Sequence, residues 1–253
     1  MILAIDIGNT TTNFGVFEGK KLKTQFAIGT QPSHTPDEAT LHIRSLAKSH
    51  RLALSKVEKV ILCSVVPRMS SLLIQALHSS GVGSIQVIGQ DVFVPLKNRY
   101  THPEQVGQDR LVGAHAALKA FKRDCIVADF GTAITIDVVN KEGEYLGGII
   151  APGLELSLEA LASRTALLPK VELKVPPELL GRDTVNSIRS GILYGCAALC
   201  DGLVSRLKAQ YAPGAVVVAT GGSGQLIADH AETIDEVRPH LVLDGLCDLA
   251  GLI

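Results

Sequence analysis

ILAIDIGNT, at residues 2–10, and CIVADFGTA, at residues 125–133, are two copies of one pattern. Each copy is a short apolar run followed by Asp-x-Gly and a threonine, and alternating apolar and polar residues come after it. Such a pattern predicts a buried strand, a tight glycine turn and a second strand. Because the copies start close to half the chain length apart, we expect a duplicated fold with two similar hairpins.

The remaining segments are expected to repeat one order of elements in each half. The first half has predicted strands near 2–8, 12–18 and 21–28, a helix from 36, a strand at 57–66, a helix from 67 and a strand at 85–88. The second half has predicted strands near 124–130, 133–140 and 143–150, helices from 153 and 184, a strand at 215–220 and helices after 224 and 244. A linking helix is expected over 107–122, and the proline-containing stretch 170–182 is expected to be a loop. This alternation predicts an α/β protein with two mixed-sheet domains, at 1–106 and 107–253, although a single doubly wound sheet is the alternative.

The composition is that of a globular protein, with 46% hydrophobic and 19% charged residues. A net charge of −1 and the lack of a basic cluster give no electrostatic case for binding nucleic acid or an anionic membrane. Asp6 interrupts the first apolar run, which argues against a signal peptide or a membrane span at this end. The five scattered cysteines favour reduced thiols, and with them a cytoplasmic location.

The two hairpins offer groups that suit the phosphates of a nucleotide. Gly8 and Gly131 let backbone N–H groups come close to phosphate oxygens, and short polar side chains beside them add donors. An aspartate at the end of a buried strand can hold a hydrated Mg²⁺, and we assign this role to Asp6, acting through water. One such hairpin would be ordinary turn chemistry. Two copies at corresponding places favour a phosphate site, in which metal and backbone dipoles offset the charge.

A third element, GQDR at residues 107–110, lies at the start of the predicted linking helix. Phosphoryl transfer to a hydroxyl needs a carboxylate that accepts a proton and a cation that orients an anionic substrate. Asp109 and Arg110 suit these roles, and a helix N-terminus favours anions. The alternative is an ordinary first-turn aspartate that complements the helix dipole, next to a surface arginine.

Together these motifs resemble those of the type III pantothenate kinases, which belong to the acetate and sugar kinase, heat-shock-70 and actin superfamily. The resemblance covers essentially the whole chain: Asp6-x-Gly8-Asn9-Thr10 with Gly15, Gly107-x-Asp109-Arg110, Asp129-x-Gly131-Thr132-Ala133, and Gly147-Gly148 with Pro152-Gly153. It implies a duplicated ribonuclease H-like, or actin-like, fold with a cleft between the two domains. It also implies ATP-dependent phosphorylation of pantothenate to 4′-phosphopantothenate, the first step of coenzyme A biosynthesis.

The resemblance assigns roles to individual residues of this chain. ATP would bind at the two hairpins, through Asp6, Ile7, Gly8, Asn9, Thr10, Thr11, Thr12, Asn13, Gly131 and Thr132. Pantothenate would bind Tyr100, Gly107, Gln108, Asp109, Arg110 and Thr184, with Asp109 as the general base. Asp129 would bind a monovalent cation, K⁺ or NH₄⁺, in addition to the Mg²⁺ near Asp6. A homodimer is implied, with the substrate pocket near its interface and Thr184 acting within its own subunit or across that interface.

Other readings stay open at this point. A kinase of the same superfamily could act on another small hydroxyl compound, such as a sugar, or on acetate. A nucleotide-dependent regulatory protein, of the actin or chaperone kind or an accessory factor for gene expression, would show negligible phosphoryl transfer to small molecules. The apolar residues of the predicted helix from 184 suit a subunit interface, but they could also pack entirely within one subunit.

Overall fold

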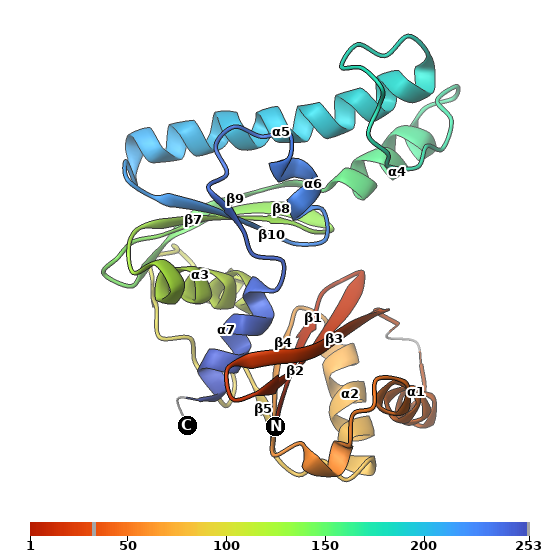
Figure 1. Cartoon of the computed structure of the whole chain (residues 1–253), viewed down its shortest axis with the longest axis vertical. Coiled ribbons are helices and arrows are strands. Elements are labelled where there is room, and N and C mark those ends of the chain that lie inside the picture. The colour runs from red at the N-terminus through yellow and green to blue at the C-terminus, as the bar shows by residue number, and fades with distance from the viewer. Residues whose placement is uncertain (32–33, 252–253) are drawn as a thin grey trace. The chain divides into compact units, whose positions relative to one another are not determined.

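The computed structural model describes residues 1–31 and 34–251, and Figure 1 shows the order of its elements. Contacts divide the chain into two compact units, each made of discontinuous segments. Unit 1 consists of Met1–Pro95, Glu104–Ala116 and Leu241–Ile253, and unit 2 consists of Leu96–Pro103 and Ala117–His240. The predicted division into 1–106 and 107–253 concerns the sequence repeat and stays a prediction. The contact units differ from it because the last helix packs on the first sheet and residues 97–98 pair with the second sheet.

Unit 1 is a five-stranded sheet with helices on both faces. Its strands lie in the order β3-β2-β1-β4-β5: β1 is Ile2–Ile7, β2 is Thr11–Glu18, β3 is Lys21–Gly29, β4 is Lys59–Ser64 and β5 is Ile85–Val87. The first three strands are antiparallel, and β4 and β5 run parallel to β1. Helices α1 (Pro36–Ser49) and α2 (Pro67–Ser79) pack on one face, and α7 (Leu241–Ala250) packs on the other with the first turns of α3 (Gln108–Phe121).

The sequence alternation of β1 explains this two-sided packing. Leu3, Ile5 and Ile7 belong to the core under α1 and α2, whereas Ala4 belongs to the core under α7. Asp6 has the parity of Ala4, so it lies on the α7 side of the sheet at the end of the strand. The strand therefore carries its carboxylate on the face that α3 and α7 cover.

Unit 2 repeats the same strand order and adds one strand at the edge. Its order is β11-β10-β7-β8-β9-β6, with β6 at Lys97–Asn98, β7 at Cys125–Phe130, β8 at Ala133–Val139, β9 at Glu144–Pro152, β10 at Val216–Thr220 and β11 at Glu236–Val237. The core order β9-β8-β7-β10-β11 matches β3-β2-β1-β4-β5 element by element, so the predicted duplication is confirmed. The two-residue strands β6 and β11 were not predicted, because they are too short to show a period.

The long helix α5 (Thr184–Gln210) lies across one face of the second sheet, as Figure 1 shows. Its buried residues Leu193, Ala197, Cys200 and Val204 pack against that sheet. Its first turns pack instead with α4 (Leu154–Arg164) and the loop of residues 165–183, which has no regular element, as predicted. We call α4, this loop and the first turns of α5 the arm. The short helix α6 (Gly224–Ala228) follows β10.

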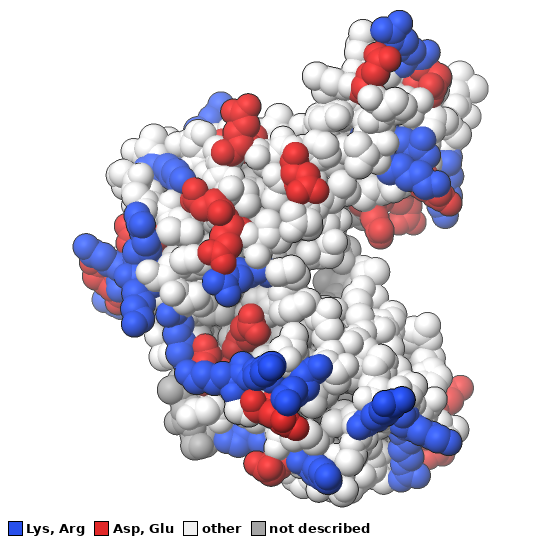
Figure 2. Space-filling model, viewed as in Figure 1, with Lys and Arg blue, Asp and Glu red and all other residues white. Residues whose placement is uncertain are grey.

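The charged residues of both signs that give the net charge of −1 are mixed on the surface in view (Figure 2). Figure 2 shows Lys and Arg side chains interspersed with Asp and Glu on the face in view. All five cysteines are free and four of them are buried, in line with the predicted reduced thiols. Within the described residues, no helix has both the length and the apolar composition that a membrane span needs.

Gly245 on α7 lies close to α3, and it provides a test of this packing. A β-carbon there would lie 2.8 Å from Val112 Cγ1 and 3.1 Å from Ala116 Cβ. Gly245→Ala is therefore expected to lower the free energy of unfolding by about 1–3 kcal/mol through overpacking, although alanine is the better helix former by about 1 kcal/mol.

The matched control is Gly202→Ala on α5, where an added β-carbon meets open space. This variant is expected to gain up to about 1 kcal/mol from helix propensity alone. Urea unfolding of both variants measures the difference, and equal stabilisation of the two would contradict the close contact between α7 and α3.

Candidate active site

The first hairpin is a tight turn that a neighbouring strand holds in place. The Gly8 N–H donates to the Thr11 carbonyl at 3.0 Å and closes the turn. Thr30, just after β3, donates its hydroxyl to the Gly8 carbonyl at 2.8 Å and its N–H to the Thr10 carbonyl at 2.9 Å. Asn9, Thr10 and Thr11 remain exposed at the tip. The turn therefore offers polar groups to a ligand on a braced backbone.

Two of the residues predicted to bind ATP here turn their side chains away from solvent. Ile7 is fully buried in the core under α1 and α2. Thr12 is also fully buried, and its hydroxyl lies 2.9 Å from the Thr30 hydroxyl, so it braces the hairpin. Any contact of these two residues with a nucleotide would have to come from the backbone. Asp6 and Asn13, in contrast, are cross-strand partners on the α7 side of the sheet and are partly accessible.

The structure brings Asp6 and Asp109 to one buried residue, Cys63. Asp6 is the neighbour of Cys63 in the parallel β1–β4 pairing, and Cys63 is fully buried. Burial raises the pKa of the Cys63 thiol, and the negative charges of Asp6 and Asp109 raise this pKa further. Such an effect requires both carboxylates to lie near the same sulfur. Two of the predicted acidic residues, 103 positions apart in the chain, thus both lie near Cys63 within unit 1.

Asp109 is held at the start of α3 in a shape that only glycine permits at position 107. The carboxylate folds back against Gly107, in space that a β-carbon there would occupy. Its Oδ1 accepts the Arg110 N–H at 2.9 Å. Burial raises the pKa of Asp109, and the Arg110 N–H and guanidinium offset part of that rise. Gln108 packs against Gly89, where a β-carbon would lie 3.0 Å from the Gln108 amide carbon.

The second hairpin places the Asp129 carboxylate beside two glycines, Gly131 and Gly221. The Asp129 carboxylate lies against Gly221, whose φ of +85° and missing side chain allow this approach, and a β-carbon on Gly131 would lie 3.6 Å from it. The Ser223 N–H donates to the Phe130 carbonyl at 3.1 Å and ties the glycine turn after β10 to this hairpin. Gly131 and Thr132 are exposed at its tip. A carboxylate is a ligand of the kind that hard cations prefer.

No group of three or more His, Cys, Asp or Glu side chains in residues 1–31 and 34–251 could hold a metal ion. Nucleotide enzymes commonly hold Mg²⁺ by one or two carboxylates together with water and substrate phosphates. Asp6 fits such a role because it is partly accessible at the end of β1.

Tyr100 meets the paired glycines of β9 within unit 2. Its ring lies over Gly147, where φ is +130° and a β-carbon would be 3.8 Å from two ring carbons. The ring centroid of Tyr145 is 6.4 Å away. Two elements of the sequence pattern that lie far apart in the chain, Tyr100 and Gly147-Gly148, are thus neighbours.

Thr184 lies on the arm, at the first position of α5. It is exposed, and the side chain of Asp183 caps the helix by accepting the Asn186 N–H at 2.9 Å. It lines a hollow of about 600 Å³ with Leu161, Ser187 and other arm residues. The part of α5 that packs on the sheet begins near Ile192, two turns later. The neighbours of Thr184 in its own unit are therefore residues of the arm.

Sequence reasoning missed several supports of this site. Thr30 has no local signal, because its value comes from hydrogen bonds to a turn about 20 residues earlier. Cys63 reads as one more apolar residue of a buried strand. The glycine-rich run 221–224 had a usable signal, because it directly follows a buried strand, but the contact of Gly221 with Asp129 was not predicted.

Comparison with known proteins agrees with this arrangement. The family model described as type III pantothenate kinase matches residues 2–206. The chain is 40% identical over 246 residues to the type III pantothenate kinase of Moorella thermoacetica, and the match covers 97% of each chain.

Two solved structures share the fold at low sequence identity. One is a Baf family protein from Campylobacter jejuni, proposed to be a transcriptional activator, with a TM-score of 0.58, 18% identity, and coverage of 99% of this chain and 98% of that one. The other is the activator of 2-hydroxyisocaproyl-CoA dehydratase from Clostridium difficile with bound ADPNP, with a TM-score of 0.54, 13% identity, and coverage of 98% and 93%. They bear on the fold alone, and the predicted duplicated actin-like α/β fold is confirmed. By its family match and its full-length relatives, the chain belongs to the type III pantothenate kinase family.

Proposed function

We propose that this chain transfers the γ-phosphoryl group of ATP to the hydroxyl of pantothenate, forming 4′-phosphopantothenate and ADP, with Asp109 as the proton acceptor. This is the pantothenate kinase reaction of its family, the first step of coenzyme A biosynthesis. The observation that carries the assignment of Asp109 is its placement: it is a partly buried carboxylate, fixed at a helix start, and its charge acts on the same buried cysteine as that of Asp6.

In the reaction, the substrate hydroxyl oxygen forms a bond to the γ-phosphorus while the bond from that phosphorus to the β–γ bridging oxygen breaks. The hydroxyl proton passes to Asp109. Burial raises the pKa of this carboxyl, so it binds a proton more readily than an exposed aspartate would. The Arg110 N–H holds Oδ1 and leaves the rest of the carboxylate for the substrate.

The two hairpins would hold the phosphates through their exposed tips. Asn9, Thr10 and Thr11 in one hairpin and Gly131 and Thr132 in the other provide N–H and hydroxyl donors. Asp6 would bind Mg²⁺ through water, and Asp129 would bind the monovalent cation, K⁺ or NH₄⁺. When bound, these cations neutralise charge on the phosphates.

Pantothenate would bind at the start of α3 and at Tyr100. Arg110 is suited to pair with its carboxylate, because a guanidinium can donate two parallel hydrogen bonds to one carboxylate. Gly107, Gln108 and the ring of Tyr100 would complete the pocket. We expect this enzyme to act in the cytoplasm.

The purified chain with ATP, Mg²⁺ and K⁺ is expected to release ADP when pantothenate is added, in a coupled assay. Asp109→Asn should lower kcat by about 10²–10⁴-fold, the usual contribution of a general base.

Replacing K⁺ by Na⁺ should lower the rate, and Asp129→Asn should remove that sensitivity. Preference for a sugar or for acetate in the same assay would overturn the substrate, and no ADP with any acceptor would favour a regulatory protein.

Asp109→Asn is also expected to make the protein more stable at neutral pH. The pKa of this carboxyl is higher in the folded protein than in the unfolded chain, so the folded state binds the proton more tightly. The free energy of unfolding therefore falls as the pH rises from the unfolded pKa through the folded pKa. The neutral amide avoids this cost. Thermal unfolding should therefore show a higher Tm for the variant at pH 7, and a smaller gain below the ordinary aspartate pKa of about 3.9. The exposed control Asp229→Asn should show no such gain, and a gain at Asp109 that did not depend on pH would contradict the argument.

A homodimer is part of the proposal, and the arm supports it. Leu167 is 92% exposed, Leu180 is 73% exposed, and Leu179 and Val175 are exposed as well. Apolar side chains gathered on one projecting segment mark an interaction surface. We propose that a second copy covers this surface and that Thr184, on the same arm, completes the pantothenate pocket of the partner.

Mixing of two inactive variants distinguishes the two positions of Thr184. If Thr184 acts across the interface, a heterodimer of Asp109→Asn and Thr184→Ala subunits contains one site with both native residues, so co-expression should restore part of the activity. If Thr184 acts within its own subunit, each site lacks one residue and the mixture should stay inactive. Light scattering that shows only monomer at micromolar concentration would contradict the dimer.

A further inference from the structure

Tyr100 depends on a very short strand for its position. β6 has only two residues, and it pairs with the start of β9. The Lys97 N–H donates to the Gly143 carbonyl at 2.8 Å, and the Arg99 N–H donates to the Tyr145 carbonyl at 2.9 Å. So short a strand makes few ladder hydrogen bonds, and its register is held weakly unless side chains reinforce it.

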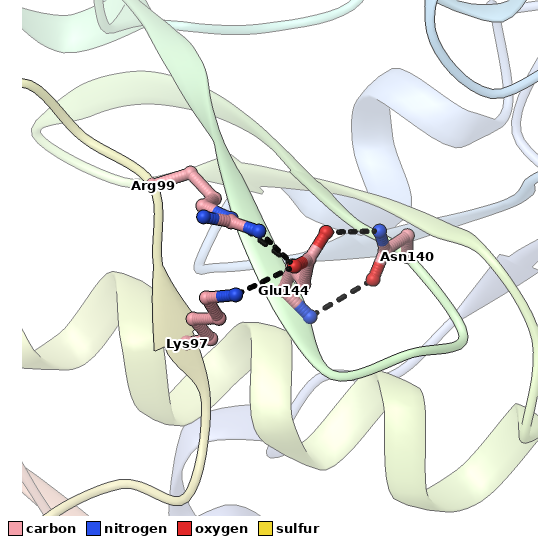
Figure 3. Close-up of polar contacts among 4 residues, drawn as sticks. All are labelled: Lys97, Arg99, Asn140 and Glu144. Atoms are coloured by element: carbon pink, nitrogen blue, oxygen red, sulfur yellow. Dashed lines mark hydrogen bonds and ion pairs between the residues drawn. The ribbon is translucent and has the colours of Figure 1, made fainter.

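One carboxylate supplies that reinforcement, as Figure 3 shows. Glu144 Oε1 lies 2.5 Å from Arg99 Nη2, 3.1 Å from Arg99 Nε and 3.4 Å from Lys97 Nζ. Its Oε2 accepts the Asn140 side-chain N–H at 3.0 Å, and Asn140 Oδ1 in turn accepts the Glu144 N–H at 2.9 Å. Glu144 therefore holds both cationic residues of this segment, while Asn140 fixes the carboxylate.

The charge state of Glu144 suits this role. The hydrogen bond from Asn140 lowers the pKa of the Glu144 carboxyl, and the contacts with Arg99 and Lys97 lower it further. The carboxylate is therefore ionised at neutral pH, and it can attract both cations.

The cluster acts on the residue that follows Arg99. The Tyr100 N–H donates to Asn98 Oδ1 at 3.0 Å, and the Asn98 side chain donates to the Pro103 carbonyl at 3.2 Å. With the backbone fixed on both sides, the ring is placed over Gly147. A small shift of β6 along β9 would therefore move the Tyr100 ring away from Gly147.

Global stability is a poor explanation for the cluster. The Arg99 and Lys97 side chains are largely exposed, and ion pairs in such places contribute little to the free energy of folding. We expect the cluster to act locally instead, by holding β6 in place, because Glu144 pairs with both Arg99 and Lys97 at this edge of the sheet.

We infer that Glu144 is a positioning residue for the substrate site: it fastens β6 to β9 through Arg99 and Lys97 and so sets the ring of Tyr100 for pantothenate binding. This inference rests on the proposed function, in which Tyr100 lines the pantothenate pocket. Glu144 itself touches neither substrate nor nucleotide in this assignment.

Steady-state kinetics of Glu144→Ala provides the first test. The KM for pantothenate should rise roughly tenfold through misplacement of a binding group, while kcat and the KM for ATP stay close to the wild-type values. Glu142→Ala is the matched control, because this exposed carboxylate in the same turn pairs with Lys141 at 3.9 Å, and no constant should change. Thermal unfolding checks that the fold is kept, and Glu144→Gln, which keeps the shape but not the charge, replaces any variant that fails this check.

A double-mutant cycle with Tyr100→Ala shows whether Glu144 acts through the ring. If it does, adding Glu144→Ala to Tyr100→Ala should raise the KM for pantothenate no further. Two independent, additive increases would overturn the inference, as would an unchanged KM in Glu144→Ala beside a raised KM in Tyr100→Ala. An unchanged KM in Tyr100→Ala would instead remove Tyr100 from the pocket, which is a failure of the proposed function.

Discussion

The carboxylates of Asp109 and Asp129 each lie against the α-carbon of a glycine, and the rest of each site depends on this contact. Asp109 folds back over Gly107, and Asp129 lies against Gly221, in space that any side chain would fill. A carboxylate placed in this way keeps its oxygen atoms near backbone groups and is shielded in part from water. The pattern of glycines beside acids is therefore a packing requirement of the site as well as a property of turns.

The core of unit 1 supplies the partly buried environment of Asp109, the proposed base. Cys63 is fully buried in the cluster under α7, and Val112, on α3 after Asp109, belongs to the same cluster. This apolar surface raises the pKa of Asp109 and opposes its ionisation in the folded protein. The cost is local and is borne by the packing of α7 and α3 on the sheet. A trade of this kind between stability and activity is common at active sites.

In unit 2, the Tyr100 ring lies at the edge of the sheet and needs support from outside its own short strand. β6 has too few backbone hydrogen bonds to hold Tyr100, and Glu144 with Asn140 adds a fixed anchor for the two cationic residues before it. The ring lies over Gly147, whose φ of +130° is a conformation that favours glycine. The arm, in contrast, leaves leucines exposed at its surface, in line with the proposed contact with a second copy.

Local sequence was sufficient for the parts of this protein that depend on periodicity and turn chemistry. The two hairpins, the start of α1, the long α5 and the glycine–aspartate motifs could all be read from residues within a few positions of one another. The family resemblance rested on the same motifs. Each signal is strong because a strand or a helix is determined mainly by its own pattern of apolar residues.

Only the tertiary structure decided which distant residues meet. Thr30 braces a turn some 20 residues earlier, α7 returns to the first sheet from the far end of the chain, and Cys63 joins Asp6 to Asp109. The structure also showed that the side chain of Thr12, predicted as a nucleotide contact, is buried and supports the hairpin through the Thr30 hydroxyl. These features leave no local trace, because a hydrogen bond or a packing contact across the fold depends on where two separate segments end up, and neither segment alone carries that information.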